Sequence, residues 1–512
     1  MNDALHKGLY ASPLKRWLVI LSVMIPSAVY VLDLTVVTVA LPHMQGTFSA
    51  TYDQISWVVT SYIVGGTIVT GCSGWASTRF GRKEVFFVSC AAFTVASIFC
   101  GMATTLESEV AWRALQGFFG APILPLSQAV MLDLYPKERH GTANSIWGMG
   151  ILLGPVLGPT VGGYMTEEYS WPWAFYVNVP FMLAPLLGIL LFVPRTPRNS
   201  DHGLDWFGFI ALCVGMGSLQ LMLNRGERQD WFASPEIIFE AVLAVIALYV
   251  FVVHILTGRK PFVPPAIFAN WNYSLGLFFV IIFAFVLQSP IVLLSLFFQD
   301  LGGYPVMTVG LLLTPRGIGA FTSMFLAGIL IAHVNPRLLM ACGFVAFGLS
   351  AYLIAGWTTE VSAWQVAWTG ILQGFGSGLV WVPMGTLAVA TLTPRLRDES
   401  LAFFHMMFNV GASLGIITMI NLALRTSVSM HASLTEYVTR FNQVFKGAVL
   451  PNLWNFSSPS GLATLNLEIT RQSGIVGYNN CFYAIAAIAV AAIPLCFLLR
   501  RGHGGQGVGH VG

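Results

Sequence analysis

Long apolar runs recur along the 512-residue chain, and each has a length that fits a lipid bilayer. A helix that crosses the hydrocarbon core needs about 20 mostly apolar residues, and the sequence contains fourteen runs that meet this requirement. They cover residues 17–41, 55–77, 84–104, 109–131, 142–164, 173–193, 204–224, 235–257, 271–299, 305–331, 337–358, 362–390, 399–424 and 476–499. The chain is therefore predicted to be an all-α membrane protein.

Composition excludes several other classes of protein. The chain is 56% hydrophobic and 9% charged, which is more apolar than a soluble domain. The net charge of +3 does not indicate a nucleic-acid partner. The 7 cysteines contain no Cys-x-x-Cys pair and no histidine lies near them at metal-ligand spacing, so we expect no disulfide framework, metal or other cofactor.

The distribution of basic residues predicts the orientation of the chain. If the amino terminus is cytoplasmic, the inside segments hold 17 Lys and Arg residues and the outside segments hold 6. This bias places both termini in the cytoplasm and the chain in the inner membrane. Acidic residues near helix ends, including Glu107 and Glu109, are assigned to the outer side. The first apolar run lacks a small-residue cleavage site, so it is interpreted as a retained helix.

An internal repeat predicts the domain organisation. Leu-Gln-Gly-Phe at 115–118 recurs at 372–375, and two glycines of the fifth predicted helix recur in the thirteenth at the same offset of 257 residues. Chance similarity between glycine-rich helices is the alternative. The repeat predicts a six-helix bundle at 1–200, two inserted helices at 201–262 and a second six-helix bundle at 263–512. Parallel halves of this kind place a substrate cavity at their interface.

Several short motifs occur in order along the predicted helices. They are Leu32-Asp33-x-Thr35, Trp112-Arg113-x-x-Gln116-Gly117, Gly154-Pro155-x-x-Gly158-Pro159-x-x-Gly162-Gly163, and Asn178-x-Pro180. Together they resemble the major facilitator superfamily, and within it the fourteen-helix drug:proton antiporters of the EmrB type. The resemblance implies the major facilitator fold and export of amphipathic drugs in exchange for protons. It also implies a periplasmic adaptor of the EmrA type and a TolC-type outer-membrane channel as partners.

Asp33 is predicted to carry the proton. An acid inside the hydrocarbon region is costly unless it is paired, neutral or hydrated, so it indicates function. Counted from Trp17 at 1.5 Å per residue, Asp33 lies roughly 24 Å along the first helix, a depth similar to that of Arg113 in the fourth. Movement of Arg113 or arrival of a substrate would then switch the protonation of Asp33. A static ion pair between the two helices is the alternative.

The fifth predicted helix carries a glycine stripe. Gly150, Gly154, Gly158 and Gly162 recur every four residues, and Pro155, Pro159 and Gly163 lie among them. Such a stripe allows close approach of a neighbouring helix. The resemblance implies an antiporter motif that packs against a helix of the second half and blocks leakage, although ordinary helix packing explains the glycines equally well.

A basic loop between the second and third helices is the candidate gate. The resemblance implies roles for Gly74, Arg79, Gly81 and Arg82, together with Asp133 and Arg139 after the fourth helix. Thr78 occupies a position where superfamily members commonly have an acid, so a charge latch is in doubt. A plain solvated loop is the alternative for Asp133 and Arg139.

Polar and aromatic residues within helices are candidates for the substrate cavity. They are Gln128, Trp147, Arg316, Gln373, Trp381 and Asn409. Arg316 follows Pro315, so stabilisation of a helix break is an alternative role. His405 is interpreted as a hydrogen-bonded interfacial residue. The long outside segment at 425–475 is predicted to be a periplasmic loop that docks the adaptor or caps the pump.

Other functions lack the motifs that they require. No His-Glu-x-x-His or Gly-x-Ser-x-Gly motif indicates an enzyme, and no Gly-x-x-x-x-Gly-Lys motif indicates an ATP-driven pump. The remaining alternative is proton-coupled export of one specific metabolite, fatty acid or lipid on the same fold.

Overall fold

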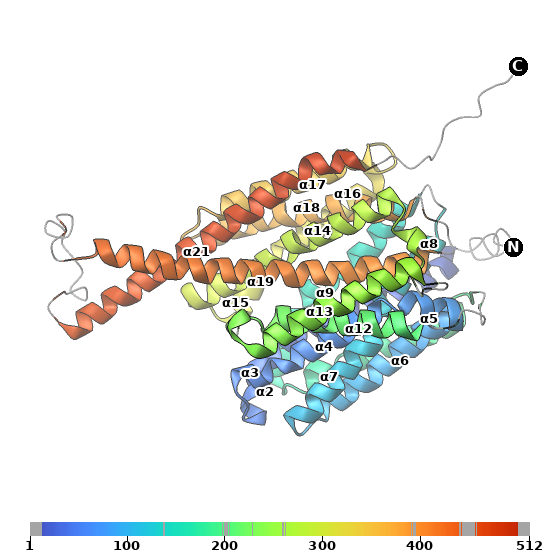
Figure 1. Cartoon of the computed structure of the whole chain (residues 1–512), viewed down its shortest axis with the longest axis horizontal. Helices are drawn as coiled ribbons and strands as arrows, with labels where there is room; N and C mark the ends of the chain where they lie inside the picture. Colours follow the sequence, from blue (N-terminus) through green and yellow to red (C-terminus); the bar gives the residue numbers. More distant parts are fainter. Residues whose placement is uncertain are drawn as a thin grey trace, which may run out of the picture.

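Helices make up the described part of the chain almost entirely. In this computed structural model the structure describes residues 13–136, 139–196, 198, 203, 205–227, 229–258, 261, 263–390, 392, 396–439, 442, 456 and 458–499. Figure 1 shows the helices packed side by side, with α2 (Pro13–Phe48) beginning at the end of the bundle where α21 (Pro459–Leu495) finishes. We call this the terminal end and the opposite end the hairpin end.

Thirteen of the described elements are long and apolar enough to cross a membrane, a count that by itself gives no orientation. Besides α2 and α21 they are α6 (Arg82–Gly101), α7 with α8 (Leu106–Gly120, Ile123–Asp133), α9 (His140–Glu168), α10 with α11 (Trp173–Tyr176, Asn178–Phe192), α12 (Trp206–Arg225), α13 (Pro235–Thr257), α14 with η4 (Trp271–Leu296, Phe297–Leu301), α15 with α16 (Val306–Leu313, Pro315–Leu330), α17 (Pro336–Ile354), α18 (Ala363–Ala390) and α19 (Arg397–Tyr437).

The remaining predicted span, at residues 55–77, corresponds to two short consecutive helices. The shorter apolar helix α4 (Trp57–Thr70) is followed by α5 (Ser73–Phe80). Gly71 and Cys72 between them keep right-handed helical angles, so the two helices follow one another as one element. All fourteen predicted spans therefore correspond to helices, and the all-α prediction is confirmed.

The helices pack in two groups. In the first group α2 contacts α9 and α11, and α7 contacts α4 and α6. In the second group α18 contacts α16 and α17, while α19 contacts α14 and α21. Helices α12 and α13 pack on each other, and α12 also touches α4 and α19. The two groups meet where α9 packs against α16 and α18, and where α19 packs against α5 and α8.

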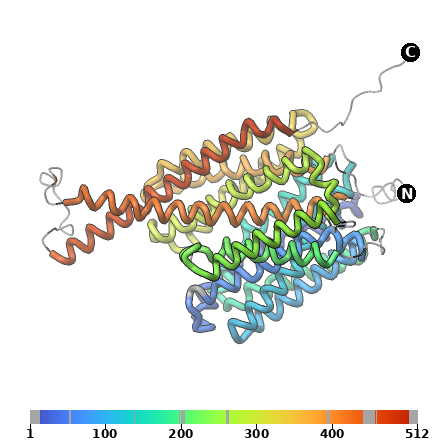
Figure 2. The backbone as a smooth tube through the Cα atoms, in the orientation of Figure 1, coloured from blue at the N-terminus to red at the C-terminus, as the bar shows by residue number. Residues whose placement is uncertain are grey.

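The described residues of the segment 425–475 are mostly helical, so the prediction of a loop was wrong for them, and residues 443–455 lie outside the described part. Helix α19 continues to Tyr437 and α21 already begins at Pro459, so both project from the bundle as a hairpin (Figure 2). The 41 residues of α19 span about 60 Å, roughly twice the hydrocarbon thickness. Hydropathy marks where the apolar residues stop, whereas the helix continues through polar residues that still favour it. At the base of this projecting hairpin, a Cβ on Gly477 would lie 2.6 Å from the Ala423 carbonyl oxygen.

The outer surface of the bundle is apolar. Leu191, Val245 and Leu256 are each more than two-thirds exposed, as lipid-facing residues of spanning helices would be. Together with the fourteen spans, this surface identifies a multi-pass membrane protein.

Candidate functional site

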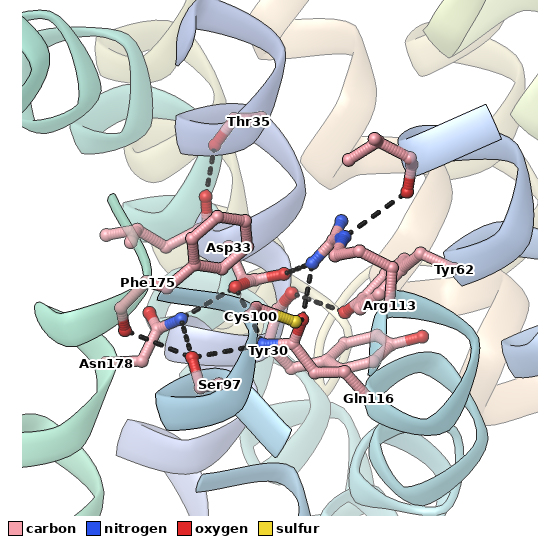
Figure 3. Close-up of polar contacts among 12 residues, drawn as sticks. Tyr30, Asp33, Thr35, Tyr62, Ser97, Cys100, Arg113, Gln116, Phe175 and Asn178 are labelled. Carbon is pink, nitrogen blue, oxygen red and sulfur yellow. Dashed lines mark hydrogen bonds and ion pairs between the residues drawn. The ribbon is translucent and has the colours of Figure 1, made fainter. Parts of the chain in front are cut away.

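A buried ion pair joins α2 to α7, as predicted. Arg113 Nη1 lies 2.6 Å from Asp33 Oδ2, and both side chains are completely buried (Figure 3). The two residues meet because α2 and α7 bring them to the same depth from opposite directions. A buried charge needs a partner, and each of these side chains supplies one for the other.

Three further polar side chains complete the surroundings of Asp33. Gln116 Nε2 and Asn178 Nδ2 both donate to Asp33 Oδ1, at 3.0 Å and 2.6 Å. Ser97 on α6 accepts hydrogen bonds from the same two amide groups. Both oxygens of Asp33 therefore accept hydrogen bonds, which suits the ionised carboxylate.

Arg113 is held by more than its ion pair. Its Nε donates to the Val58 carbonyl (3.3 Å), Nη1 also donates to Gln116 Oε1 (2.5 Å), and the guanidinium lies 4.1 Å from the centre of the Tyr62 ring. Its Nη2 is buried and has no hydrogen-bond partner among the described residues. The guanidinium therefore keeps one unused donor inside the protein.

A cavity of about 680 Å³ lies between the two groups of helices. Its wall is mostly apolar and aromatic, and it includes Tyr30, Leu34, Tyr62, Trp147, Phe283, Met324, Trp381, His405, Phe408 and Asn409. The Trp147 and Trp381 rings, one from each group, lie nearly parallel with their centres 6.0 Å apart. The wall also reaches Glu227, which follows α12 at the hairpin end. A cavity of this size and composition suits a drug-sized ligand.

Helices α2 and α4 lie between the cavity and the ion pair. Val31 and Leu34 face the cavity from α2, whereas Asp33 between them points into the first group. Tyr62 lines the cavity and its ring also covers Arg113. The Tyr62 hydroxyl donates to the Tyr30 carbonyl (3.2 Å), so both tyrosines separate the cavity from the ion pair.

Three of the six predicted cavity residues line this cavity, namely Trp147, Trp381 and Asn409. The other three do not, and their side chains lie elsewhere. Arg316 Nη2 donates to the carbonyl of Leu287 (2.6 Å), a residue of the cavity wall. Gln373 is 1% exposed, and neither of its polar atoms has a partner among the described residues.

Gln128 belongs to a hydrogen-bond chain that crosses between the groups. His405 Nε2 lies 2.8 Å from Gln128 Oε1, and Gln128 Nε2 donates to Asn144 Oδ1 (3.0 Å). Asn144 Nδ2 in turn donates to Thr386 Oγ1 (3.2 Å). Gln128 and Asn144 belong to the first group, whereas His405 and Thr386 belong to the second. The interpretation of His405 as an interfacial, hydrogen-bonded residue agrees with this geometry.

The glycine stripe of α9 packs against α2, which contradicts the expected contact with a second-half helix. A Cβ on Gly154 would lie 2.8 Å from the Leu32 nitrogen, and one on Gly162 would lie 3.0 Å from the Val36 Cα. Gly150 and Gly158 likewise face Met24 and Thr35, whereas a Cβ on Gly163 would meet no atom within 4 Å. The four-residue period fixes which residues share a face but does not fix the neighbouring helix.

The contact of α9 with the second group uses other residues. A Cβ on Gly310 of α15 would lie 3.2 Å from Pro159 Cβ. A Cβ on Gly317 of α16 would lie 2.4 Å from Val156 Cγ2. The glycines that allow this approach therefore lie on α15 and α16, and also on α9, where a Cβ on Gly148 would lie 2.8 Å from Met324 Sδ. Pro155 is part of the cavity wall.

An ion-pair cluster joins the two groups at the terminal end. Arg82 Nη2 and Nε lie 2.6 Å and 3.0 Å from the two oxygens of Asp398. Arg82 also pairs with Asp133, whose other oxygen lies 2.6 Å from Arg397 Nη1. Ser77 Oγ donates to Asp398 (2.8 Å). Asp398 comes from α19, so a second-group acid pairs with the basic loop although Thr78 itself only donates to the Gly74 carbonyl.

The two glycines of the predicted gate lie at positions that a side chain would disturb. A Cβ on Gly74 would lie 2.5 Å from the Glu399 Cα, so the absence of a side chain lets α5 touch the start of α19. Gly81 has φ +96°, which favours glycine at the start of α6. Arg79 lies over the Trp75 ring (5.9 Å), and Arg139 is exposed before α9.

Comparison with known proteins gives the family. A family model described as Major Facilitator Superfamily matches residues 23–416. The chain belongs to the major facilitator superfamily. It is 30% identical to the Multidrug export protein EmrB of Escherichia coli (strain K12), over 96% of this chain and 97% of that protein. It is 28% identical to the Fatty acid resistance protein FarB of Neisseria gonorrhoeae, over 94% of this chain and 95% of that protein.

Solved structures show the same fold. The human organic anion transporter MFSD10 (TETRAN) matches with a TM-score of 0.62 at 13% identity, covering 96% of this chain and 100% of that one. The proton:xylose symporter XylE matches with a TM-score of 0.58 at 14% identity, covering 94% and 96%. These likenesses establish the major facilitator fold, which is that of a transporter family and not of an enzyme family.

Several residues of this major facilitator chain escaped the sequence analysis. Gln116 and Asn178 were noted only as parts of motifs, and their contact with Asp33 depends on side-chain directions that spacing does not give. Tyr62 and Asp398 carried no signal beyond their residue type. Glu109 was assigned only to the outer side of the membrane, and its complete burial was not predicted.

Proposed function

We propose that the chain is a proton-coupled multidrug efflux transporter that exports amphipathic compounds by alternating access. The observation that carries this proposal is the buried Asp33–Arg113 pair directly behind the wall of an aromatic cavity. An intramembrane acid indicates a functional site by default, and proton relays are one of its known uses. The EmrB relatives bear the name Multidrug export protein, which supports the substrate class.

The substrate binds in the cavity between the two groups of helices. Aromatic side chains from both groups line it, and flat rings contact varied apolar shapes without demanding a precise hydrogen-bond pattern. Trp147 and Trp381 face one another from opposite groups. A bound amphipathic compound would therefore touch both groups at once, as alternating access requires.

The proton binds at Asp33. In this structure the carboxylate is paired with Arg113 and accepts two amide hydrogen bonds. A substrate that contacts Tyr30 or Tyr62 would move the Tyr62 ring that covers Arg113. This movement would change how well Arg113 stabilises the charged carboxylate of Asp33. The substrate and the proton then influence each other through residues of α2 and α4, although they bind at separate sites.

The ion-pair cluster around Arg82 acts as the gate of the terminal end. It closes that end by joining the two groups, whereas the cavity wall extends towards the hairpin end. Entry of a substrate from the terminal end requires the Arg82–Asp398 contact to break. We infer that residues 1–200 and 263–512 then rock as two halves about the cavity, with 201–262 as two inserted helices.

The positive-inside bias gives the orientation. Both termini would be cytoplasmic, the membrane would be the bacterial inner membrane, and the projecting hairpin would lie in the periplasm. Helices α19 and α21 project from the bundle (Figure 2) and would offer a protein a place to dock. This partner would be an EmrA-type adaptor that connects to a TolC-type outer-membrane channel.

A second candidate function is export of a fatty acid or a similar anionic amphiphile. Arg316 is bonded to Leu287 of the cavity wall, and none of the ion pairs among the described residues includes it. A carboxylate at the edge of the cavity would neutralise this guanidinium. The name of the FarB relative, Fatty acid resistance protein, agrees with this alternative.

Proton release from purified protein in liposomes tests the proposal. A lipophilic dye such as ethidium, added to vesicles with an acidic interior, should release protons in the parent, and Asp33→Asn should abolish this release. Glu167→Gln, which removes an exposed acid at the end of α9, is the matched control and should behave as the parent. Release that persists in Asp33→Asn would exclude Asp33 as carrier. A response to medium-chain fatty acids alone would favour the second function.

A further inference from the structure

A second acid is buried close to the ion pair. Glu109 lies in the first turn of α7, one helical turn before Arg113, and its residue is completely buried. Neither carboxyl oxygen has a hydrogen-bond partner among the described residues. Glu107, two residues earlier in the same turn, is exposed. The burial of Glu109 is therefore a property of its position in the fold and not of the helix end in general.

The surroundings of Glu109 are apolar apart from the ion pair. An apolar cluster at the hairpin end of the first group contains Val37, Ala40, Met44 and Ile55, and residues beside Glu109 such as Leu106 and Val110 pack against it. The groups that act on Glu109 electrostatically are Arg113 on its own helix, Asp33 on α2 and Cys100 on α6.

The lack of hydrogen-bond partners within the described part of the chain favours the neutral form of Glu109 in this structure. An ionised carboxylate without any hydrogen bond inside an apolar cluster is strongly unfavourable, so Glu109 is compatible with this structure in its neutral form. With Asp33 ionised and Arg113 charged, the three groups then carry no net charge. A neutral acid next to an ionised acid is the arrangement in which a proton can move from one to the other.

A second ion pair is available in the same cluster. Arg113 Nη2 has no partner, and Glu109 lies four residues before Arg113, the spacing and order that favour an ion pair on a helix. An ionised Glu109 could therefore be stabilised by the donor that Arg113 does not use. The two groups without partners, one donor and one acid, lie on the same helix one turn apart.

We propose that Glu109 is a second proton-binding site, placed between Asp33 and the hairpin end, that delivers protons to Asp33. This inference rests on the proposed proton-coupled function. In the transfer the O–H bond of Glu109 breaks and a new O–H bond forms on the Asp33 carboxylate. Glu109 becomes the carboxylate that pairs with Arg113, and Asp33 becomes neutral. The net charge of the three groups is zero before and after.

The transfer also explains how Arg113 can change partners without a buried charge being left alone. Glu109 lies one turn, or about 6 Å, nearer to the hairpin end than Arg113. A proton that arrives from that end reaches Glu109 before it reaches Asp33. Reloading Glu109 from the hairpin end returns Arg113 to Asp33 once Asp33 has released its proton.

Two transport assays on protein in liposomes test the proposal. The first measures dye export driven by a pH gradient, and the second measures exchange of labelled for unlabelled dye without a gradient, which needs no net proton movement. Glu109→Gln should slow the first at least tenfold and leave the second within twofold of the parent. The exposed Glu107→Gln is the matched control and should change neither.

The outcomes separate this inference from the proposed function. If gradient-driven export is the same in Glu109→Gln as in Glu107→Gln, or if Glu109→Gln loses exchange and export together, Glu109 is not on the proton path. A parent that shows no gradient-driven export would instead contradict the proposed function itself.

Infrared spectroscopy provides a test that does not require transport. The parent and Glu107→Gln should show the carbonyl stretch of a buried protonated carboxyl, and Glu109→Gln should lack it. If Glu109→Gln fails to fold, Glu109→Asp is used in its place, and it should retain the band because it keeps an acid at the position. A band of unchanged intensity in Glu109→Gln would overturn the assignment.

Discussion

The Arg82–Asp398 contact predicts how strongly the terminal end is held closed. Asp398→Asn removes the charge from the one acid that the second group contributes to Arg82, but it leaves Arg82 paired with Asp133 inside the first group. Both side chains of the contact are only about a tenth exposed, at 10% and 12%, so solvent screens it little. The variant therefore weakens the contact between the groups without leaving Arg82 as an isolated charge.

The magnitude follows from the number of bonds. Arg82 makes two hydrogen bonds, one to each oxygen of the Asp398 carboxylate. The amide that Asp398→Asn introduces has a single oxygen, so one bond becomes a weaker bond to a neutral acceptor and the other is lost, at about 1 kcal/mol each. The loss of about 2 kcal/mol shifts the ratio of open to closed molecules roughly 30-fold towards the state that is open at the terminal end.

Distances between spin labels across the terminal end measure this shift. Phe80 and Leu338 are about half exposed and belong to different groups, so labelled cysteines at these positions report separation of the halves. The exposed Cys342 must first be replaced by serine. Asp300→Asn, which removes an exposed acid at the hairpin end, is the control. A distance distribution of Asp398→Asn that matches this control would refute the view of the cluster as a gate.

Two further predictions concern packing and substrate binding. Gly154→Ala places a methyl group 2.8 Å from the backbone of α2 and should lower stability by about 2 kcal/mol, whereas Gly163→Ala, with no atom within 4 Å, should be neutral in thermal unfolding of the detergent-solubilised protein. Equal unfolding midpoints would contradict the close approach of α9 to α2. Trp381→Ala removes the ring that faces Trp147 and should weaken dye binding about tenfold in equilibrium dialysis. The exposed Trp364 on the same helix supplies the control variant Trp364→Ala, and a similar loss in both would assign the effect to general destabilisation.

The sequence predicts properties that depend on position along a helix. Apolar length gave the fourteen spans, because each helix must cross the same thickness of hydrocarbon. The fixed rise per residue placed Asp33 and Arg113 at a common depth, and they are in contact. These predictions need no knowledge of which helices are neighbours beyond the pair itself.

Properties that depend on direction around a helix were not predictable in the same way. The glycine stripe of α9 shares one face as its period requires, yet the helix that it meets is α2. The position of Glu109 near the end of a predicted span assigned it to the outer side but did not predict that its side chain is buried. The first helix was expected to end at residue 41, but α2 continues to Phe48, which packs against Trp171 over the hairpin end of the first group. That extra length helps to bury the apolar cluster around Glu109.

The two copies of the internal repeat share a close helix contact but differ in the polar groups that surround it. Gly117 and Gly374 occupy matching positions, and a Cβ on either would collide with a backbone oxygen of a neighbouring helix, that of Tyr62 at 2.1 Å and that of Arg316 at 1.9 Å. The residues just before them, Gln116 and Gln373, are also identical. Gln116 binds Asp33, whereas Gln373 is buried without a partner among the described residues.

The two halves thus share the contact that holds their helices together, but within the described residues only the first surrounds its glutamine with an acid and an arginine. In the proposed function, a proton bound at Asp33 would therefore act on the first half alone. Proton binding would act on α2 and α7, and the second half would respond through the cavity and the Arg82–Asp398 contact.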